Sequence, residues 1–264
     1  MYKLIVSDLD DTLLNSYKNV SQKDIDSINS LNGVRFVVST GRGYDSISRT
    51  LKQLNQYDKE DTYSITFNGG LITENKNNRI LYEKGHTFED VKRLFELGKN
   101  YDVCMHVYIK GVSYTYRLYD NERRYISGVL DYVEIDDIDF LKDVTIMKIL
   151  YGNEDMRYLE QIRNEINLED EFAICFSANR YLEFNPKGVD KGTGLTKLSE
   201  ILKIELSQCI AIGDSSNDLS MIKNAGLGVA VNNAVELIKQ NADVILESDH
   251  NNSPITELID RFVK

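Results

Sequence analysis

The acidic stretch Asp8-Leu9-Asp10-Asp11-Thr12-Leu13-Leu14 lies at the end of a short apolar segment, residues 3–9, that predicts a buried strand. Open α/β sheets bind their ligands at the carboxyl ends of the strands, so the position of this stretch is suggestive in itself. A strand end can also bring two carboxylates close to one oxygen-preferring cation. Taken alone, the stretch has an alternative interpretation as an acidic turn that caps the next segment.

A second acidic cluster, Gly213-Asp214-Ser215-Ser216-Asn217-Asp218, also follows a short apolar run, residues 209–212. Two strand ends therefore offer carboxylates that can converge, and hard cations such as Mg²⁺ choose oxygen ligands. Without a cation, several adjacent carboxylates repel one another and some become protonated. The alternative is a polar loop in which Ser216 or Asn217 caps a helix, although capping and metal binding can coexist.

Two further segments have the residue types that hold a phosphoryl group. The strand predicted at residues 34–39 ends at Thr40-Gly41-Arg42-Gly43, whose hydroxyl and backbone N–H groups suit phosphate oxygens. Lys191 lies in Gly188-Val189-Asp190-Lys191-Gly192, where a helix begins, and a lysine there places a positive charge on a phosphate. The alternatives are an ordinary strand-to-helix turn and a surface lysine.

The order of predicted elements indicates two different modules in one chain. Strands and helices alternate in residues 1–83 and again in 186–264, which favours a parallel sheet with helices on its faces. Residues 84–185 instead combine helices with hairpins, as in an α+β module. The sequence therefore predicts a discontinuous α/β core, 1–83 and 186–264, with an inserted module, 84–185.

Composition excludes several classes of function. The chain has 264 residues and a net charge of −11, which argues against binding to nucleic acid or an anionic membrane surface. No apolar run approaches the roughly 18–20 residues of a membrane span, and the N-terminus reaches an acidic residue too early for a signal peptide. Cys104, Cys175 and Cys209 lie far apart, which indicates reduced thiols rather than a disulfide framework or zinc knuckle, and a cytoplasmic protein.

With these residues in view, the sequence resembles the haloacid dehalogenase superfamily of phosphohydrolases, in particular its Cof-type group with a large cap. Asp8-Leu9-Asp10-Asp11-Thr12 matches the first motif, D-x-D-x-T, with Asp11 where glycine is more usual. Thr40 matches the second motif, Lys191 the third, and the 213–218 segment the fourth, G-D-x-x-N-D. Phe67-Asn68-Gly69-Gly70 is similar to a further group element. Residues 248–254 depart from the group, which often has a glycine-containing loop there.

The resemblance implies a Rossmann-like parallel core with an inserted α+β cap, and a role for each motif residue. Asp8 is expected to be the nucleophile and Asp10 the general acid and base, with Thr40 and Lys191 offsetting the charge of the phosphoryl group. The implied Mg²⁺ ligands are Asp8, Asp10 through its carbonyl, Asp214 and Asp218, the last as a ligand or supporting group. The implied substrate and phosphate contacts are Leu9, Gly41, Arg42, Asn68, Gly69 and Asn217.

The leading functional hypothesis is a Mg²⁺-dependent phosphatase acting on a small phosphorylated metabolite, either a sugar phosphate or a nucleotide- or cofactor-type compound. A phosphomutase of the same superfamily is the first alternative. A receiver-like signalling module phosphorylated on aspartate is the second, although receivers have about 120 residues and do not account for the insert. The tyrosines of the insert are interpreted as half-buried packing residues, and His86 and His106 as structural. The physiological substrate and the oligomeric state are not predicted.

Overall fold

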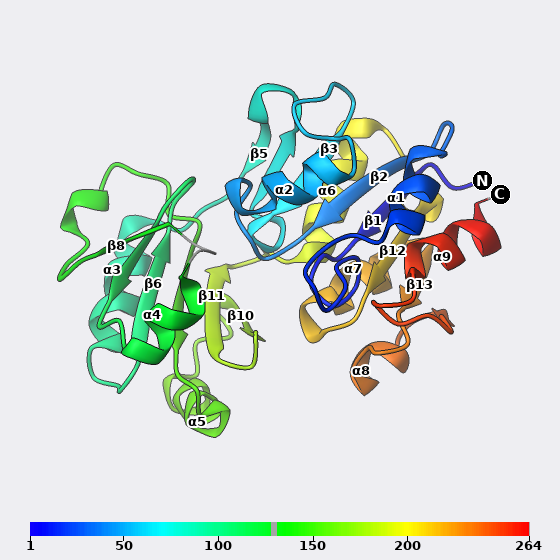
Figure 1. Ribbon diagram of the computed structural model, residues 1–264. Coiled ribbons are helices and arrows are strands. Elements are labelled where there is room, and N and C mark those ends of the chain that lie inside the picture. The colour runs from blue at the N-terminus through cyan, green and yellow to red at the C-terminus, as the bar shows by residue number, and fades with distance from the viewer. Residues whose placement is uncertain (128–130, 264) are drawn as a thin grey trace. The chain divides into compact units, whose positions relative to one another are not determined.

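The structure is a computed structural model that describes residues 1–127 and 131–263 (Figure 1). It divides into two compact units, each described here by itself. The first unit comprises Met1–Glu83 and Asp190–Lys264, and the second comprises Lys84–Val189. The chain therefore leaves the first unit once, after Glu83, and re-enters it at Asp190. The sequence-based boundaries were 83 and 185.

The first unit is built on a sheet whose strand order, within the described residues, is β14-β13-β12-β1-β2-β3-β4-β5. All neighbours from β14 to β3 pair in parallel, and β3, β4 and β5 pair antiparallel. The strands are β1 (Leu4–Ser7), β2 (Arg35–Ser39), β3 (Tyr63–Thr66), β4 (Leu71–Glu74), β5 (Arg79–Glu83), β12 (Cys209–Gly213), β13 (Leu227–Ala230) and β14 (Val244–Ile245).

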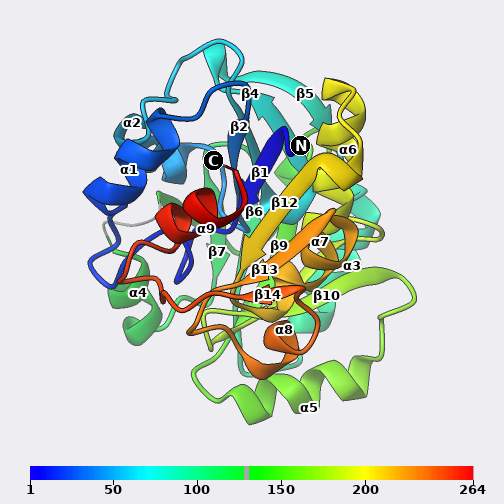
Figure 2. The same cartoon turned by 90° about the vertical axis from the view of Figure 1, so that its right-hand side faces the viewer.

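Helices cover both faces of this sheet, which explains why its central strands are buried along nearly their whole length. Figure 2 shows α1 and α9 on one side of the strands and α6 and α7 on the other. The α-helices are α1 (Gln22–Asn29), α2 (Ser48–Gln53), α6 (Lys191–Leu202), α7 (Leu219–Asn224), α8 (Glu236–Lys239) and α9 (Pro254–Phe262). All four residues of β1 are buried, and so is every residue of β12.

The second unit has a sheet with the order β10-β11-β9-β6-β7-β8 in the part of the chain that is described. Its pairs are antiparallel except β7 with β8. The strands are β6 (Cys104–Tyr108), β7 (Ser113–Tyr116), β8 (Tyr132–Glu134), β9 (Lys148–Gly152), β10 (Phe172–Ser177) and β11 (Tyr181–Pro186). The helices are α3 (Phe88–Gly98), α4 (Asp120–Ile126) and α5 (Met156–Ile166). The predicted fold class, a parallel α/β core with an inserted α+β module, is confirmed.

Two predicted elements differ from the structure. The sequence after Gly43 predicts a helix to about Gln56, but the structure divides this segment into a 3₁₀ turn, Asp45–Ile47, and α2, because Ile47 has φ −102° and ψ 0° at the junction. The apolar residues in the segment from Val144 to Tyr151 predict a strand, but the strand in the structure begins only at Lys148. Val144 instead closes a turn in which its N–H donates to the carbonyl of Leu141 at 3.0 Å.

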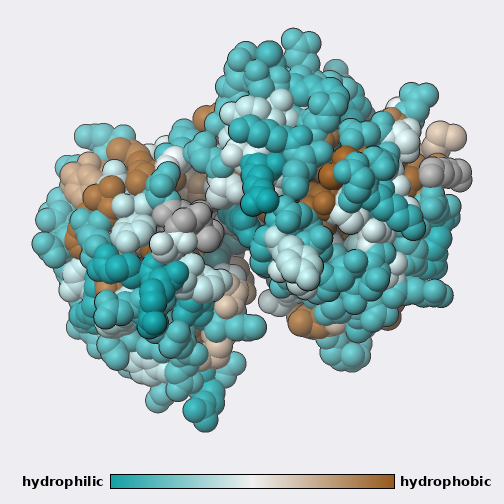
Figure 3. All heavy atoms as spheres, viewed as in Figure 1, coloured by the Kyte–Doolittle hydropathy of each residue, from teal (hydrophilic) through white to brown (hydrophobic). Residues whose placement is uncertain are grey.

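Hydrophilic side chains predominate on the face shown in Figure 3, in keeping with the net charge of −11. In residues 1–127 and 131–263, none of the helices has both the length and the apolar composition needed to cross a bilayer.

Candidate active site

The first and fourth motifs meet because the strands before them are neighbours. β1 and β12 pair in parallel with Ser7 opposite Ile212, and the N–H of Asp8 donates to the carbonyl of Ile212 at 2.9 Å. Asp8 follows β1 and Asp214 follows β12, so both leave the sheet at the same edge. This is the convergence of two strand ends that the sequence predicts.

Three carboxylates surround a buried lysine at this edge. Oxygen atoms of Asp8, Asp214 and Asp218 lie within 4.8 Å of one another. The Nζ of Lys191, which is 1% exposed, donates to Oδ1 of Asp8 at 2.5 Å and to Oδ1 of Asp218 at 2.6 Å. Lys191 is the first residue of α6, and the side chain of Asp190 caps that helix by accepting the N–H of Thr193. The predicted lysine is therefore part of a charged cluster rather than a surface residue.

The pKa shifts of the side chains in this cluster indicate that it has more negative than positive charge. Burial and the neighbouring Asp218 raise the pKa of the Asp8 carboxyl well above its usual value, although Lys191 opposes this. Burial and Asp218 likewise raise the pKa of Asp214 to about 6. Burial lowers the pKa of Lys191, but the charges of Asp218 and Asp8 outweigh burial and raise it above its usual value.

The four side chains fit a hard divalent cation. Three carboxylates against one ammonium leave a formal surplus of two negative charges. The carboxylates offer only oxygen atoms as metal ligands, and oxygen is the ligand type that Mg²⁺ and Ca²⁺ prefer. A cation placed among them would lower the raised pKa values of Asp8 and Asp214, because an opposite charge favours the ionised form.

Asp218 is the most constrained member of the cluster. Its Oδ1 accepts from Lys191, and its Oδ2 accepts the backbone N–H groups of Asp214 and Ser215, both at 3.0 Å. It is fully buried. These bonds fix the loop that carries Asp214, so Asp218 suits a supporting role better than that of a direct ligand.

The carboxylate of Asp10 pairs with two basic side chains, Arg42 and Lys18. Its carboxylate accepts from Nε of Arg42 at 2.8 Å, from Nη2 of Arg42 at 2.5 Å and from Nζ of Lys18 at 3.3 Å. Burial raises the pKa of Asp10, but the charge and hydrogen bonds of Arg42, together with Lys18, outweigh burial and lower it. The carboxyl group of Asp10 is therefore held in its ionised form.

The second motif lies against the Asn-Gly-Gly segment. The N–H of Asn68 donates to the carbonyl of Thr40, and the N–H of Phe67 donates to the carbonyl of Arg42, both at 3.0 Å. Nδ2 of Asn217 donates to Oδ1 of Asn68 at 3.4 Å, which ties the fourth motif to the same segment. The Thr40 side chain is buried, and its Oγ1 accepts the N–H of Arg42 at 3.2 Å.

Three of the residues predicted to contact the substrate have no polar side chain with which to bind it. They are Leu9, Gly41 and Gly69. Leu9 is fully buried within the apolar core of the first unit. A Cβ on Gly41 would lie 3.0 Å from Oδ1 of Asn68, and one on Gly69 would lie 2.3 Å from the carbonyl oxygen of Asp190. Close packing accounts for both glycines, and any contact of these three residues with a ligand is through the backbone.

Sequence reasoning did not assign a role to two residues that contact the site. Thr12 is fully buried, and its Oγ1 donates to Oδ1 of Asp214 at 2.9 Å. Lys18 pairs with Asp10 and Asp11, each at 3.3 Å. Thr12 belongs to the quoted first motif, so its position was a usable signal. The sequence holds no comparable signal for Lys18. Lys18 itself has a left-handed backbone conformation, with φ 56°, and the chain there returns its side chain toward Asp10.

Residues 248–254, the segment that departs from the family pattern, are linked by hydrogen bonds to the first motif and to the loop that follows it. Oδ1 of Asn251 accepts the N–H of Ser16 at 3.0 Å. The N–H of His250 donates to Oδ1 of Asn233 at 2.9 Å, and Nδ2 of Asn233 in turn donates to the carbonyl of Asp11 at 2.8 Å. Ser253 has a φ of 58°, the conformation in which glycine is most common. The glycine-free loop thus reaches the left-handed conformation with a serine.

Comparison with known proteins identifies the class. Residues 5–259 match the haloacid dehalogenase-like hydrolase family, and the chain belongs to that family. Family membership, together with relatives that are named as phosphatases, shows that the chain is a phosphatase.

The similarity extends over nearly the whole chain. The Bacillus subtilis (strain 168) protein YxeH is 29% identical over 263 residues, covering 95% of this chain and 94% of that protein. The 5-amino-6-(5-phospho-D-ribitylamino)uracil phosphatase YcsE of the same strain is 29% identical, covering 94% of this chain and 90% of that protein. A haloacid dehalogenase-like hydrolase from Bacteroides thetaiotaomicron, whose crystal structure is known, has a TM-score of 0.84 and 31% identity, with 99% of both chains covered.

Proposed function

We propose that this phosphatase is a Mg²⁺-dependent phosphomonoesterase in which Asp8 attacks the phosphorus atom of a small phosphorylated metabolite. The new bond joins a carboxylate oxygen of Asp8 to phosphorus while the bond to the leaving oxygen breaks, giving an aspartyl-phosphate. Water then attacks the same phosphorus atom, the bond from phosphorus to the Asp8 oxygen breaks, and inorganic phosphate leaves as the carboxylate is regenerated. The observation that carries the proposal is the position of Asp8 at a strand end, bonded to Lys191 and grouped with Asp214 and Asp218.

Asp8 and Asp214 are the residues that would hold the cation, together with the backbone carbonyl of Asp10. When bound, Mg²⁺ supplies charge that offsets the transferring phosphoryl group and orients it for attack. Asp218 keeps the Asp214 loop in place through the two backbone N–H groups described above. Lys191 places an ammonium between Asp8 and Asp218, where it offsets charge on the phosphoryl oxygens.

Asp10 is proposed to donate a proton to the leaving oxygen and to take one from the attacking water. A general acid must be protonated when it acts, whereas Arg42 and Lys18 favour the ionised form of Asp10. Substrate binding is therefore proposed to draw Arg42 from Asp10 toward the anionic phosphate. The Thr40 hydroxyl and the backbone N–H groups of the adjacent turn are proposed as further phosphate contacts.

The second unit, Lys84–Val189, is proposed to be the cap that selects the substrate and excludes water during the reaction. The substrate class is proposed as a sugar phosphate or a nucleotide- or cofactor-type phosphate, and the activity named for the relative YcsE supports the second of these. The free cysteines support a cytoplasmic location.

The test is release of inorganic phosphate from a panel of phosphorylated metabolites, with and without Mg²⁺. Asp8→Asn removes the nucleophile and should abolish turnover. Asp11→Asn is the matched control, because Asp11 is exposed and its φ of 57° suits asparagine. We expect Asp11→Asn to retain nearly wild-type activity.

Three outcomes would reject parts of the proposal. Retained activity in Asp8→Asn would exclude Asp8 as the nucleophile. An isomeric phosphate formed without free phosphate would establish the phosphomutase alternative. A stable aspartyl-phosphate with no turnover, formed from a small phosphodonor such as acetyl phosphate, would establish the receiver-like alternative.

A further inference from the structure

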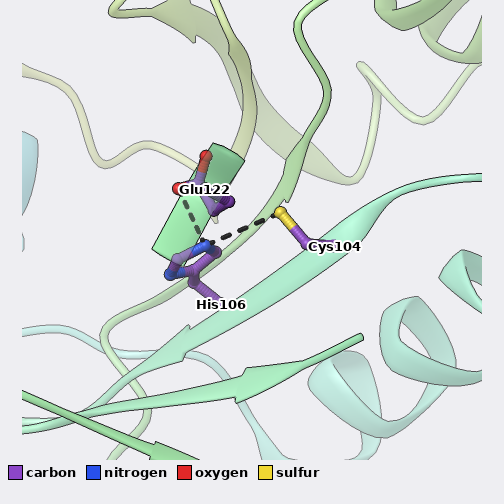
Figure 4. Close-up of side chains that lie close together, drawn as sticks. All are labelled: Cys104, His106 and Glu122. Carbon is purple, nitrogen blue, oxygen red and sulfur yellow. Dashed lines mark hydrogen bonds and ion pairs between the residues drawn. The ribbon is translucent and has the colours of Figure 1, made fainter. Parts of the chain in front are cut away.

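The second unit contains a compact group of three potential metal ligands that the phosphatase reaction does not use. Cys104 and His106 lie on β6, and Glu122 lies on α4, which follows β7 in the chain. Residues two apart on a strand point to the same face, so Cys104 and His106 lie side by side. One ligand atom from each of the three residues lies within 4.8 Å of the others, and all three residues are buried (Figure 4).

Both contacts within this group are made to one nitrogen atom. Nε2 of His106 lies 3.7 Å from Sγ of Cys104 and 3.3 Å from Oε1 of Glu122. A single imidazole nitrogen carries either one proton or one lone pair, so it cannot form a full hydrogen bond with both partners. A cation at the centre of the triangle would bond to all three atoms at once.

The two separations made by Nε2 of His106 match a tetrahedral zinc site, and the ligand atoms of Cys104 and Glu122 lie within 4.8 Å of each other. Zinc bonds of about 2.0–2.1 Å to nitrogen and oxygen and about 2.3 Å to sulfur separate nitrogen from oxygen by about 3.3 Å and nitrogen from sulfur by about 3.6 Å. The observed separations are 3.3 Å and 3.7 Å. A mixed sulfur, nitrogen and oxygen donor set favours Zn²⁺ over Mg²⁺, which prefers oxygen ligands only.

The surroundings provide an outer shell and an approach for the ion. The hydroxyl of Tyr181 donates to Oε1 of Glu122, and Nε of Arg180 lies 3.5 Å from Oε2 of the same carboxylate. A cavity of about 220 Å³ is lined by Cys104 and Glu122 and by the acidic residues Asp102 and Glu154. This cavity can admit an ion and hold a water molecule as the fourth ligand.

A catalytic cysteine is the rival interpretation, and the surroundings of the thiol oppose it. Burial and the negative charge of Glu122 raise the pKa of the Cys104 thiol to about 12. A reactive cysteine needs the opposite, a lowered pKa in an electropositive environment.

We propose that Cys104, His106 and Glu122 bind one Zn²⁺ ion, which fastens α4 to β6 within the second unit. Binding forms bonds from the metal to Sγ, Nε2 and a carboxylate oxygen. The thiol proton, which is donated to the carbonyl of Gly152 without the metal, leaves to solvent, and the imidazole binds the metal through the lone pair of Nε2. The inference is independent of the proposed phosphatase chemistry, since it involves none of the residues of that site.

The test is metal binding to the full chain after chelator treatment and removal of the chelator. Zinc is added in excess Mg²⁺, unbound metal is removed, and the bound zinc is measured by elemental mass spectrometry. Cobalt(II) serves as the spectroscopic probe, because a thiolate ligand gives a charge-transfer band that a site made only of carboxylates cannot give. We expect one zinc per chain, and this cobalt band, in the wild type.

Variants separate the proposed ligands from other cysteines and histidines. Cys104→Ser and His106→Gln should each weaken zinc binding at least about tenfold and remove or alter the cobalt band. Cys175→Ser, on β10 of the same unit, and His250→Gln, in the first unit, are the matched controls and should change neither measurement.

A milder variant keeps the proposal testable if a ligand variant does not fold. Tyr181→Phe removes only the hydroxyl that donates to Glu122, so we expect zinc affinity to fall about 10–100-fold with the fold preserved. A cobalt spectrum without the thiolate band in the wild type would overturn the proposal. Zinc binding unchanged in both Cys104→Ser and Tyr181→Phe would overturn it as well.

Discussion

Arg42 holds the carboxylate of Asp10 with two hydrogen bonds, one from Nε at 2.8 Å and one from Nη2 at 2.5 Å. This fork joins the second motif to the first motif, because Arg42 follows Thr40 and Asp10 follows Asp8. The geometry is the bidentate arginine–carboxylate pairing, which also suits a phosphate group. Under the proposed mechanism Arg42 serves either partner in turn, and its departure from Asp10 toward the phosphate would let the pKa of Asp10 rise.

The first prediction concerns the pH dependence of turnover. Arg42 lowers the pKa of Asp10, and a general acid loses activity as pH rises through its pKa, so Arg42→Gln should move the basic limb of kcat/KM to higher pH. Asp10→Asn should lower kcat by about 10²–10⁴-fold, the usual contribution of a general acid and base. Both are measured by phosphate release from acid to neutral pH, because the lowered pKa of Asp10 places this basic limb of kcat/KM below neutrality.

Arg35→Gln is the control for this experiment, because Arg35 pairs with Asp61 at the surface of the same unit. It should leave the pH profile unchanged. A basic limb that does not move in Arg42→Gln would show that Asp10 does not set it.

The second prediction concerns Thr12 and the cation. Thr12→Val keeps the side-chain shape but removes the hydroxyl that donates to Oδ1 of Asp214 at 2.9 Å. We expect the Mg²⁺ concentration needed for half-maximal activity to rise about 10–100-fold, as for other losses of support to a metal ligand. Activity should largely recover at saturating Mg²⁺. Thr12→Ser retains a hydroxyl and should behave like the wild type, and an unchanged Mg²⁺ requirement in Thr12→Val would contradict the assignment of Asp214 as a ligand.

The third prediction separates steric overlap from backbone strain. Gly69 has a φ of 98° and Gly33 a φ of 73°, so alanine is strained at both positions, by about 1–3 kcal/mol. A Cβ on Gly33 has no neighbour within 4 Å, whereas one on Gly69 overlaps the carbonyl oxygen of Asp190. Gly69→Ala should therefore lower the free energy of unfolding more than Gly33→Ala in urea titrations. It should also lower activity, because Asp190 precedes Lys191. If the free energy of unfolding falls equally in both variants, steric overlap at Gly69 adds nothing to the backbone strain and the prediction is wrong.

The fourth prediction concerns the pH dependence of stability. Burial raises the pKa of Asp24, although Thr256 and Ser21 donate hydrogen bonds to its carboxylate. A carboxyl group with a folded-state pKa above its unfolded value of about 3.9 binds its proton more tightly when folded, so its contribution to stability falls as pH rises through that window. Asp24→Asn stays neutral, and its free energy of unfolding relative to wild type should therefore increase from pH 4 toward neutrality, by at most about 1.4 kcal/mol per pH unit.

Urea titrations of both proteins at several pH values make this comparison. Asp26→Asn, on the exposed side of the same helix, is the control and should show a smaller change with pH. A difference between Asp24→Asn and wild type that shrinks with rising pH would contradict the argument.

The convergence of Asp8 and Asp214 was predictable because it depends only on two apolar strands and on the acidic residues directly after them. Parallel neighbours in an open sheet must end at one edge, and the pattern of apolar runs identifies the strands. The depth of Lys191 was not predictable, since a lysine after a glycine turn has the same local sequence whether it is exposed or buried. Its burial comes from pairing with two carboxylates that are distant in sequence.

The grouping of Cys104, His106 and Glu122 shows the same limit. Strand periodicity places Cys104 and His106 on one face. Nothing in the sequence indicates that Glu122, 16 positions after His106, lies beside them, so the sequence favours a structural interpretation of His106. That contact depends on how α4 returns to β6, which the spacing of apolar residues does not determine.

The re-entry of the chain at Asp190 has a consequence for how such proteins diversify. Asp190 caps α6 by accepting the N–H of Thr193 at 2.8 Å, and the N–H of Gly192 donates to Oγ of Ser220 at 2.9 Å. These two bonds anchor the backbone on both sides of Lys191, one residue after the junction with the inserted unit. A module of different size or shape can therefore be spliced between Glu83 and Asp190 without dislodging the lysine, which, under the proposed function, would let the choice of substrate evolve separately from the chemistry that acts on it.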